Sequence, residues 1–429
     1  MAVTNDTTQL TGLLKNVYAK GIVDAYSFAA PLASRLIKFD QQAAGLGNTY
    51  NQPVDLQLEN SFTSSAADTV PTFLAINAGK MENATATGCQ LYGRSAVSYE
   101  AMARSKYPTQ KAFETAVKRV TKRLSMSHLK RLEMQLICGR RGIAVVESST
   151  NSTVTSTTII TAESWSAARF AGMVGATLSA QRANRSTAIF PTTVAGTASL
   201  TAVATSTRTL TIVGLAADMD DLSTANGVGA ILYLESNGTI TQFGNTTEIA
   251  GLEAWCNMSG TWSNIATGTY DLWNPNVYST STGVISFGKI VEAAEMTAPY
   301  GAVKKLVALC SVKAFSVLNT DLAALRQYDS SYKTSKGELG VEGIEFKCSV
   351  GTIEILPHPM CSDGICIIFA PDEVLRTGAC DIEFVERNGE KLVLESATTP
   401  SGEMRTMSNQ QLFVEQPRHL VYMSGITFG

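Results

Sequence analysis

One stretch of the sequence has the residue types and the charge density needed to bind a polyanion. Residues 106–141 hold ten lysines and arginines against two glutamates, a local charge of 10 − 2 = +8 in a chain of formal net charge −3. Basic side chains on one face attract a phosphate backbone without reading its sequence. The alternative is a solvated helix face, but such faces normally mix both signs of charge. We therefore favour DNA or another polyanion as the partner, with these candidate contacts: Lys111, Lys118, Arg119, Lys122, Arg123, Lys130 and Arg131.

This basic stretch has the sequence of a long helix. Residues 108–138 would extend roughly 45 Å at 1.5 Å per residue. Its apolar stripe is Phe113, Val117, Val120 and Leu124 in the first half, then Leu129, Leu132 and Leu136 in the second. Because the two stripes are offset, we expect the helix to bend, break or change its packing partner near residues 125–127.

Signatures of catalysis and of metal binding are missing from the sequence. The three histidines, His128, His358 and His419, have no evident Ser, Cys or Asp partner. The sequence contains neither a nucleophile elbow with its partners nor a phosphate loop. Its eight cysteines lack the spacing of a zinc site. We therefore expect no catalytic residue, no metal site and no cofactor, and we do not expect an enzyme.

The composition favours a protein that assembles. Only 17% of the 429 residues are charged, against about a quarter in typical proteins, and 45% are hydrophobic. Subunit interfaces are depleted of charge at their cores, although a monomer with a Ser- and Thr-rich surface is the alternative. The first residues lack the basic start and apolar run of a signal peptide. No stretch of eighteen apolar residues predicts a membrane span.

The rest of the chain predicts an arm, a hairpin and alternating helices and strands. Residues 9–25 predict an amphipathic helix in an N-terminal arm. Residues 49–100 predict two strands, the second at 88–99, and because an isolated hairpin is marginal in water, this one should project and lie on a neighbour. Residues 186–288 are Thr- and Gly-rich, predict short strands and carry a charge of 1 − 7 = −6. Further predictions are helices at 162–182, 286–296 and 313–325, and strands at 303–309, 351–357, 364–370, 381–387, 391–395 and 411–423, the last of them broken by Pro417.

Several local segments occur in a characteristic order. They are Leu14–Ala19, Thr49–Val54, Leu272–Pro275, Gly283–Ala294, Val307–Val317 and Pro357–Pro359. In this order they resemble the major capsid proteins of tailed bacteriophages, whose Hong Kong 97-type fold is shared with encapsulin shells. The resemblance covers nearly the whole chain and rests on order, not on an invariant motif. It implies an α+β fold with an N-terminal arm, an extended β-hairpin loop, a long spine helix, peripheral and axial domains and a β-rich insertion.

The resemblance also implies a division of the chain. It gives an N-terminal arm (1–48), the extended loop (49–105), a peripheral domain with the spine helix (106–185), a β-rich outer insertion (186–282), an axial domain (283–375) and a return to the peripheral domain (376–429). In this family the spine helix lines the inner side of the shell, where its basic residues would screen packed DNA. The arm before the fold is short, so a separate scaffolding protein is expected.

The function implied is that of a major capsid protein. Its pentamers and hexamers would close an icosahedral shell around double-stranded DNA, in the virion, after synthesis in the cytoplasm of a bacterial host. Further expected partners are a portal protein, a scaffolding protein and a decoration protein on the acidic outer side, and no membrane is expected. Two alternatives stay open: an encapsulin-like compartment with the same fold, and a tail or fibre protein, suggested by the Thr- and Gly-rich middle.

Overall fold

The computed structural model describes most of the chain. The described residues are 30–41, 49–100, 116–185, 187–190, 198–234, 240–241, 244–245, 247–301, 305–320, 333–336, 342–386, 394–395 and 401–428. The helix predicted at 9–25 and the candidate Lys111 lie outside these residues.

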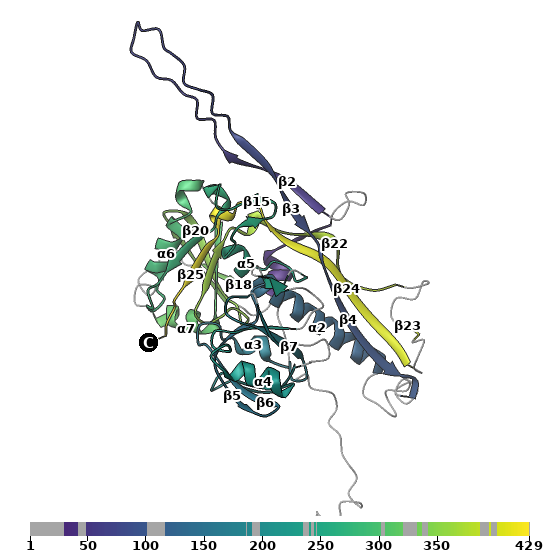
Figure 1. Ribbon diagram of the computed structural model, residues 1–429. Helices are drawn as coiled ribbons and strands as arrows, with labels where there is room; N and C mark the ends of the chain where they lie inside the picture. Colours follow the sequence, from purple (N-terminus) through teal and green to yellow (C-terminus); the bar gives the residue numbers. More distant parts are fainter. Residues whose placement is uncertain are drawn as a thin grey trace, which may run out of the picture.

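A long ribbon of strands spans the molecule (Figure 1). Its central strand, β24 (Ser401–Val414), pairs antiparallel with β22 (Val374–Phe384) and with β4 (Cys89–Ser98). The short strands β1 (Phe39–Gln41) and β23 (Leu394–Glu395) complete this five-stranded sheet. Because β1 runs parallel to β22, the first described segment is built into the body.

Helix α2 (Ala116–Cys138) lies against this ribbon and runs unbroken through residues 125–127. In its first half, Leu124 packs in a small cluster with Val97 of β4 and Met404 of β24. In its second half, Leu132 and Leu136 belong to the main core. The offset of the two apolar stripes therefore corresponds to a change of packing partner and not to a break.

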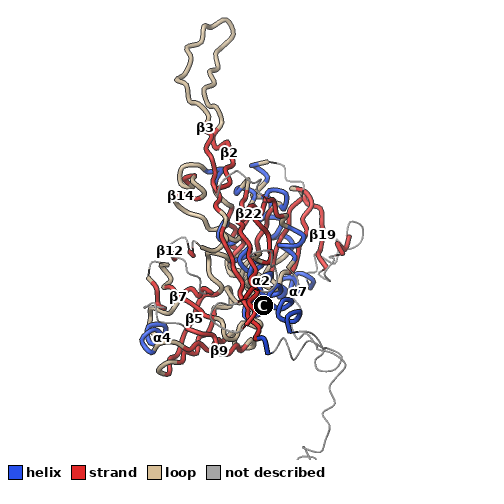
Figure 2. Tube along the Cα trace, turned by 90° about the vertical axis from the view of Figure 1, so that its right-hand side faces the viewer, coloured by secondary structure: helices blue, strands red, loops and turns tan. Residues whose placement is uncertain are grey.

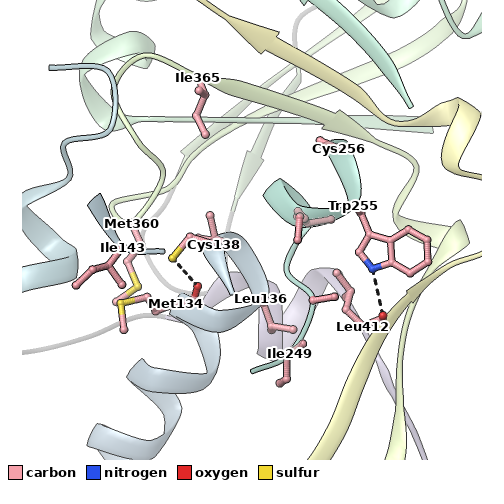
Figure 3. Packing of buried hydrophobic residues seen from close by; sticks show 14 of the residues in the cluster. Met134, Leu136, Cys138, Ile143, Ile249, Trp255, Cys256, Met360, Ile365 and Leu412 are labelled. Carbon is pink, nitrogen blue, oxygen red and sulfur yellow. Dashed lines mark hydrogen bonds between the residues drawn. The ribbon is translucent and has the colours of Figure 1, made fainter. Parts of the chain in front are cut away.

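The main core gathers around the end of α2 (Figure 3). Trp255 of α5 (Leu252–Cys256) is 1% exposed, and its indole Nε1 donates to the carbonyl oxygen of Leu412 at 3.3 Å. The rings of Trp262, Trp273 and Phe413 surround it edge-on, with centroids 5.7, 6.2 and 5.8 Å away. Aromatic side chains bury the most area per residue, so this cluster joins α2, α5 and the ribbon firmly.

An antiparallel seven-stranded sheet forms a second lobe, at the bottom of Figure 1. Helix α4 (Ala216–Ser223) packs against it. The order β11-β5-β6-β10-β9-β7-β8 combines strands from both sides of the boundary expected at residue 185. The strands are β5 (Ala144–Ser152), β6 (Thr155–Ile160), β7 (Thr177–Gln181), β8 (Ala188–Phe190), β9 (Ala198–Ala204), β10 (Thr209–Val213) and β11 (Ile231–Leu234).

The helix predicted at 162–182 is wrong. Only α3 (Ala167–Phe170) is helical, and β7 occupies the end of this range. Gly172 and Gly175 have φ angles of 70° and 91°, in the left-handed region that glycine adopts readily. These two residues end the helix, and residues 178–181 are then buried as a strand.

A mixed seven-stranded sheet forms the third part, with order β16-β25-β21-β17-β20-β19-β18. Helices α6 (Phe287–Glu295) and α7 (Val312–Thr320) share its core. The helix predicted at 286–296 and the strands predicted at 303–309, 351–357 and 364–370 are confirmed. The strands are β16 (Asn276–Ser279), β17 (Lys305–Cys310), β18 (Lys333–Lys336), β19 (Glu342–Cys348), β20 (Gly351–Pro357), β21 (Cys366–Phe369) and β25 (Val421–Ser424).

The end of the chain crosses from the ribbon into this mixed sheet. The strand predicted at 411–423 with a break at Pro417 is indeed divided there: β24 ends at Val414, the short helix η5 (Pro417–His419) follows, and β25 begins at Val421. Pro417 cannot donate to a ladder, which explains the interruption. Strand β25 lies between β16 and β21, so residues expected in the return to the peripheral domain complete the mixed sheet.

The projecting hairpin differs from the prediction in its second strand. Strand β2 (Thr49–Gln57) pairs with β3 (Lys80–Thr87), whereas residues 89–98 form β4 in the ribbon. Only Gly88 separates β3 from β4, and a β-carbon there would lie 2.1 Å from Oδ1 of Asn409. Residues 80–98 are therefore one extended segment, whose first part (β3) belongs to the hairpin and whose second part (β4) belongs to the ribbon. Residues 58–79 form the outer loop, which reaches beyond the rest of the molecule (Figures 1 and 2).

Short elements complete the described structure. They are η1 (Leu32–Leu36), β12 (Ile240–Thr241), β13 (Gly244–Asn245), β14 (Thr261–Trp262), β15 (Ile265–Ala266), η2 (Asp271–Trp273), η3 (Ala298–Tyr300) and η4 (Pro371–Glu373). Among the described helices, none combines the length and the apolar character needed to cross a membrane.

Candidate nucleic-acid interface and subunit contacts

The first half of α2 presents basic side chains to solvent. Residues 116–131 contain six lysines and arginines and no acid. Lys118 and Lys122, four residues apart and therefore on one helix face, are exposed, as is Arg123. Arg119 is half-buried. We call Lys118, Arg119, Lys122 and Arg123 the basic half of α2.

Two predicted contact residues bind groups of their own chain, Lys130 in the interior and Arg131 half-buried. Lys130 is 7% exposed, and its Nζ donates to the carbonyl oxygen of Ala171. Burial lowers the pKa of Lys130 to about 8. Arg131 forms an ion pair of 2.9 Å with Glu248, which is itself buried. Both side chains join α2 to neighbouring segments of the same chain, so we remove them from the candidate interface.

Glu133, the acid in the second half of α2, connects three distant segments. Its Oε1 and Oε2 accept the backbone N–H groups of Leu32 and Ala33 at 2.8 and 2.9 Å. Its Oε1 also lies 2.9 Å from Nε2 of His358, and both side chains are fully buried. Since Nδ1 of His358 accepts the N–H of Met360 at 3.1 Å, Nε2 carries the proton donated to Glu133. In the sequence, one feature indicates this role: Glu133 is the single acid among the residues of α2, which are otherwise rich in lysine and arginine.

Arg376 fixes the other end of the same N-terminal segment. Its guanidinium donates to the carbonyl oxygens of Ile37 and Ala33 at 3.0 and 2.8 Å, and to Oε1 of Gln410 at 3.0 Å. Because Arg376 is 3% exposed, these bonds lie in a protein environment where unpaired polar groups are costly. Residues 32–41 are therefore anchored to both α2 and the ribbon.

The histidines take structural positions. His128 is buried, with Nδ1 2.8 Å from Oγ1 of Thr406 and Nε2 2.9 Å from Oγ of Ser408. Burial lowers the pKa of His128 to about 4, so the ring is neutral near pH 7. His419 pairs with Glu373 at 2.8 Å. Within the described residues, no three His, Cys, Asp or Glu side chains gather closely enough to hold a metal ion.

The projecting hairpin exposes large apolar side chains. Phe62, Phe73 and Ile76 are 80, 83 and 88% exposed. With four others they form what we call the apolar loop set, each member 60% exposed or more: Leu58, Phe62, Val70, Phe73, Leu74, Ile76 and Met81. Concentrations of exposed apolar area on one segment mark interaction sites. The sequence predicts a hairpin that lies on a neighbour, but we did not predict these side chains as its contacts.

The base of the hairpin is held by the body. Ala84 and Ala86 of β3 are buried, as is Leu56 of β2. The N–H of Thr85 donates to the carbonyl oxygen of Ser263 at 2.9 Å, in the turn between β14 and β15. The hydroxyl of Tyr270 donates to Glu82 at 3.1 Å. The hairpin therefore leaves the body from a fixed base.

No protein-family profile matches the sequence, and no curated protein matches it. Solved structures do match. The capsid asymmetric unit of cyanophage A-1(L) aligns with a TM-score of 0.58 and 10% identity, covering 99% of this chain and 100% of that chain. The capsid of an empty GTA particle aligns with a TM-score of 0.51 and 8% identity, again covering 99% and 100%. The chain has the Hong Kong 97-type capsid fold.

The capsid fold confirms the predicted α+β class. It accommodates one long helix, a ribbon that continues into a projecting hairpin, and two sheeted lobes within a single chain. An identity of 8–10% transfers the capsid fold and not the role of any single residue.

Proposed function

We propose that this chain is the major capsid protein of a tailed bacteriophage, which assembles into an icosahedral shell around double-stranded DNA. The observation that carries the proposal is the capsid fold, shared over the full length of both chains. The protein would be made in the host cytoplasm and located in the virion. We keep the domain division given above with two changes supported by the strand pairings: residues 144–234 belong together, and β25 belongs with the axial domain.

The hairpin supports assembly through its exposed apolar side chains. An isolated two-stranded hairpin is marginal in water, and each side chain of the apolar loop set is 60% exposed or more. Burying one large apolar side chain contributes about 1.5–3 kcal/mol before the costs of association. The proposed partner is therefore a neighbouring subunit, on which each hairpin lies within pentamers and hexamers.

The basic half of α2 supports contact with packed DNA. Exposed lysines and arginines bind phosphate groups without sequence preference, and such binding weakens as salt rises. In the proposed shell α2 is the spine helix of the inner side, facing the DNA. The acidic Thr- and Gly-rich region would face outward, where a decoration protein could bind, and separate portal and scaffolding proteins complete the proposed assembly.

Electron microscopy of the purified full chain tests the proposal. The expected result is closed shells in negative stain, and particles from the native source should show the ultraviolet absorbance of nucleic acid. A protein that stays monomeric at high concentration would contradict a shell. Rods or spikes would identify a tail or fibre protein, and native shells without nucleic acid would identify an encapsulin-like compartment.

A further inference from the structure

A cavity of about 270 Å³ lies where three parts of the fold meet. Arg141 and Gly142 reach it from the end of α2, and Arg185 from the turn after β7. Tyr422 and Gly425 line it from the mixed sheet. The cavity therefore lies between the segment after α2, the antiparallel seven-stranded sheet and the mixed sheet.

Two arginines share this cavity. Nη2 of Arg185 donates to the carbonyl oxygen of Arg141 at 3.2 Å, while Nη1 of Arg185 is buried and has no hydrogen-bond partner. The turn that carries Arg185 is fixed, because the N–H of Arg182 donates to the carbonyl oxygen of Thr187 at 3.0 Å. No described carboxylate forms an ion pair with either Arg141 or Arg185.

A buried tyrosine next to the cavity also lacks a partner. Tyr233 of β11 is 1% exposed, and its hydroxyl forms no hydrogen bond. Its ring lies against Gly142, where a β-carbon would come within 3.4 Å of Cε1. Burial raises the pKa of Tyr233, and Arg185 and Arg141 act in the opposite direction. The neutral hydroxyl is a donor, and buried donors are almost always satisfied by protein, water or ligand.

The carboxylates around the cavity leave an excess of positive charge. Glu253 lines it but is already paired with Arg169 at 2.8 Å. Glu163 also lines it but is exposed to solvent. Arg141 and Arg185 therefore keep two positive charges without a bound counter-ion in a restricted volume, a setting in which a negative ligand interacts more strongly than in water.

We propose that this cavity binds a small free oxyanion, inorganic phosphate or sulfate. The guanidinium groups of Arg141 and Arg185, which line the cavity, hold the charge, since arginine suits planar, paired contacts to phosphate oxygens. The Tyr233 hydroxyl is buried and is not part of the cavity lining. Because Arg141 lies in the turn after α2 and Arg185 follows β7, a bound anion ties the end of the helix to the seven-stranded sheet beside the mixed sheet. The site thus adds stability where the parts of the body join.

Thermal unfolding of the purified full chain with added sodium phosphate tests the site. At the same ionic strength, the Tm in sodium phosphate is expected to exceed the Tm in sodium chloride by about 2–4 °C. This rise should saturate as the phosphate concentration increases. The variant Arg141→Gln/Arg185→Gln is expected to lose this saturable rise. The matched control Lys38→Gln/Lys347→Gln removes the same charge from exposed positions outside the cavity and is expected to keep it.

Phosphate also stabilises proteins in general through exclusion from their surfaces. The test of the site is therefore the difference between the rise in Tm of the wild type and that of the double variant. An equal rise in wild type and in the double variant would overturn the proposal. If the double variant does not fold, Arg185→Lys replaces it, which keeps the charge but loses the paired contact, with an expected weakening of phosphate affinity of severalfold in calorimetric titration. Unchanged affinity in that variant, or no saturable heat of binding in the wild type, would also overturn it.

Discussion

Lysine and arginine have two different roles along α2, and burial separates them. Lys118 and Lys122 are exposed, whereas Lys130 and Arg131, two to three turns further on, bind groups of their own chain. All four belong to the same run of basic residues. The exposed members suit a solvent-facing electrostatic role, and the buried ones fix the helix in place.

The sequence could predict this basic run but not its division. Charge density and helical spacing are local properties, and they identified the exposed residues. The burial of Lys130 depends on Ala171, and that of Arg131 on Glu248, contacts between positions 41 and 117 residues apart. Such contacts follow from tertiary packing, which no local pattern contains. For the same reason the cavity beside Arg141 could not be predicted.

The buried ring of His128 makes the stability of the subunit depend on pH. Its pKa is about 4 in the folded protein, against about 6.5 in an unfolded chain. Between these values the unfolded state binds the proton and the folded state does not, so the free energy of unfolding falls as pH drops from 6.5 to 4. We expect His128 to account for about 1–3 kcal/mol of this loss.

Urea unfolding at a series of pH values measures this effect. The variant His128→Gln, which cannot titrate there, is expected to lose less stability than the wild type between pH 6.5 and 4.5. The absolute stability of the variant falls because the hydrogen bonds to Thr406 and Ser408 change. The two proteins are therefore compared by the slope of the free energy of unfolding against pH. Parallel pH profiles for the two proteins would show that other groups are responsible.

At the scale of the element, the hairpin is expected to serve assembly and not folding. The variant Phe62→Ser/Phe73→Ser removes two exposed rings that contact no core. We expect its Tm to stay within about 1 °C of the wild type. The concentration needed for shell formation should rise by about tenfold or more, because each lost ring forfeits over a kcal/mol of burial.

Light scattering during assembly and microscopy of the products give the measurement. Val174→Ser is the matched control, since Val174 is 62% exposed on a different element. Assembly of the double variant at the wild-type concentration would contradict the proposed role of the hairpin. A large loss of Tm would instead assign the two rings to folding.

The elements that the sequence predicts best are those with a strong local pattern. Strand β20 matches the predicted residues 351–357, and α6 lies within the predicted 286–296. The hairpin is harder, because the choice of β3 over β4 as partner of β2 is a matter of long-range pairing. The helix prediction at 162–182 was wrong because Gly172 and Gly175 adopt positive φ angles and end the helix. A pattern of apolar residues contains no information on these angles.

At the scale of the molecule, the basic half of α2 is expected to retain DNA in the shell. The variant Lys118→Gln/Lys122→Gln/Arg123→Gln should assemble normally, since these side chains are exposed. It should hold less DNA, and the slope of log affinity against log salt should become shallower by up to about 3, one for each lost phosphate contact.

Nucleic-acid absorbance of purified particles and DNA binding across a salt series provide the readouts. Lys38→Gln/Lys347→Gln removes exposed charges elsewhere and is the control. If the DNA content of the triple variant is unchanged, residues other than these three retain the DNA. Failure of the triple variant to assemble would show that these side chains are structural.

The position of β25 has a consequence for how translation ends. This strand lies between β16 and β21, so a nascent chain that stops before residue 421 leaves a gap inside the mixed sheet, with two strand edges open. Domains fold as units while the ribosome releases them, and this one is completed only when residue 424 has emerged. A truncated product therefore lacks a complete mixed sheet.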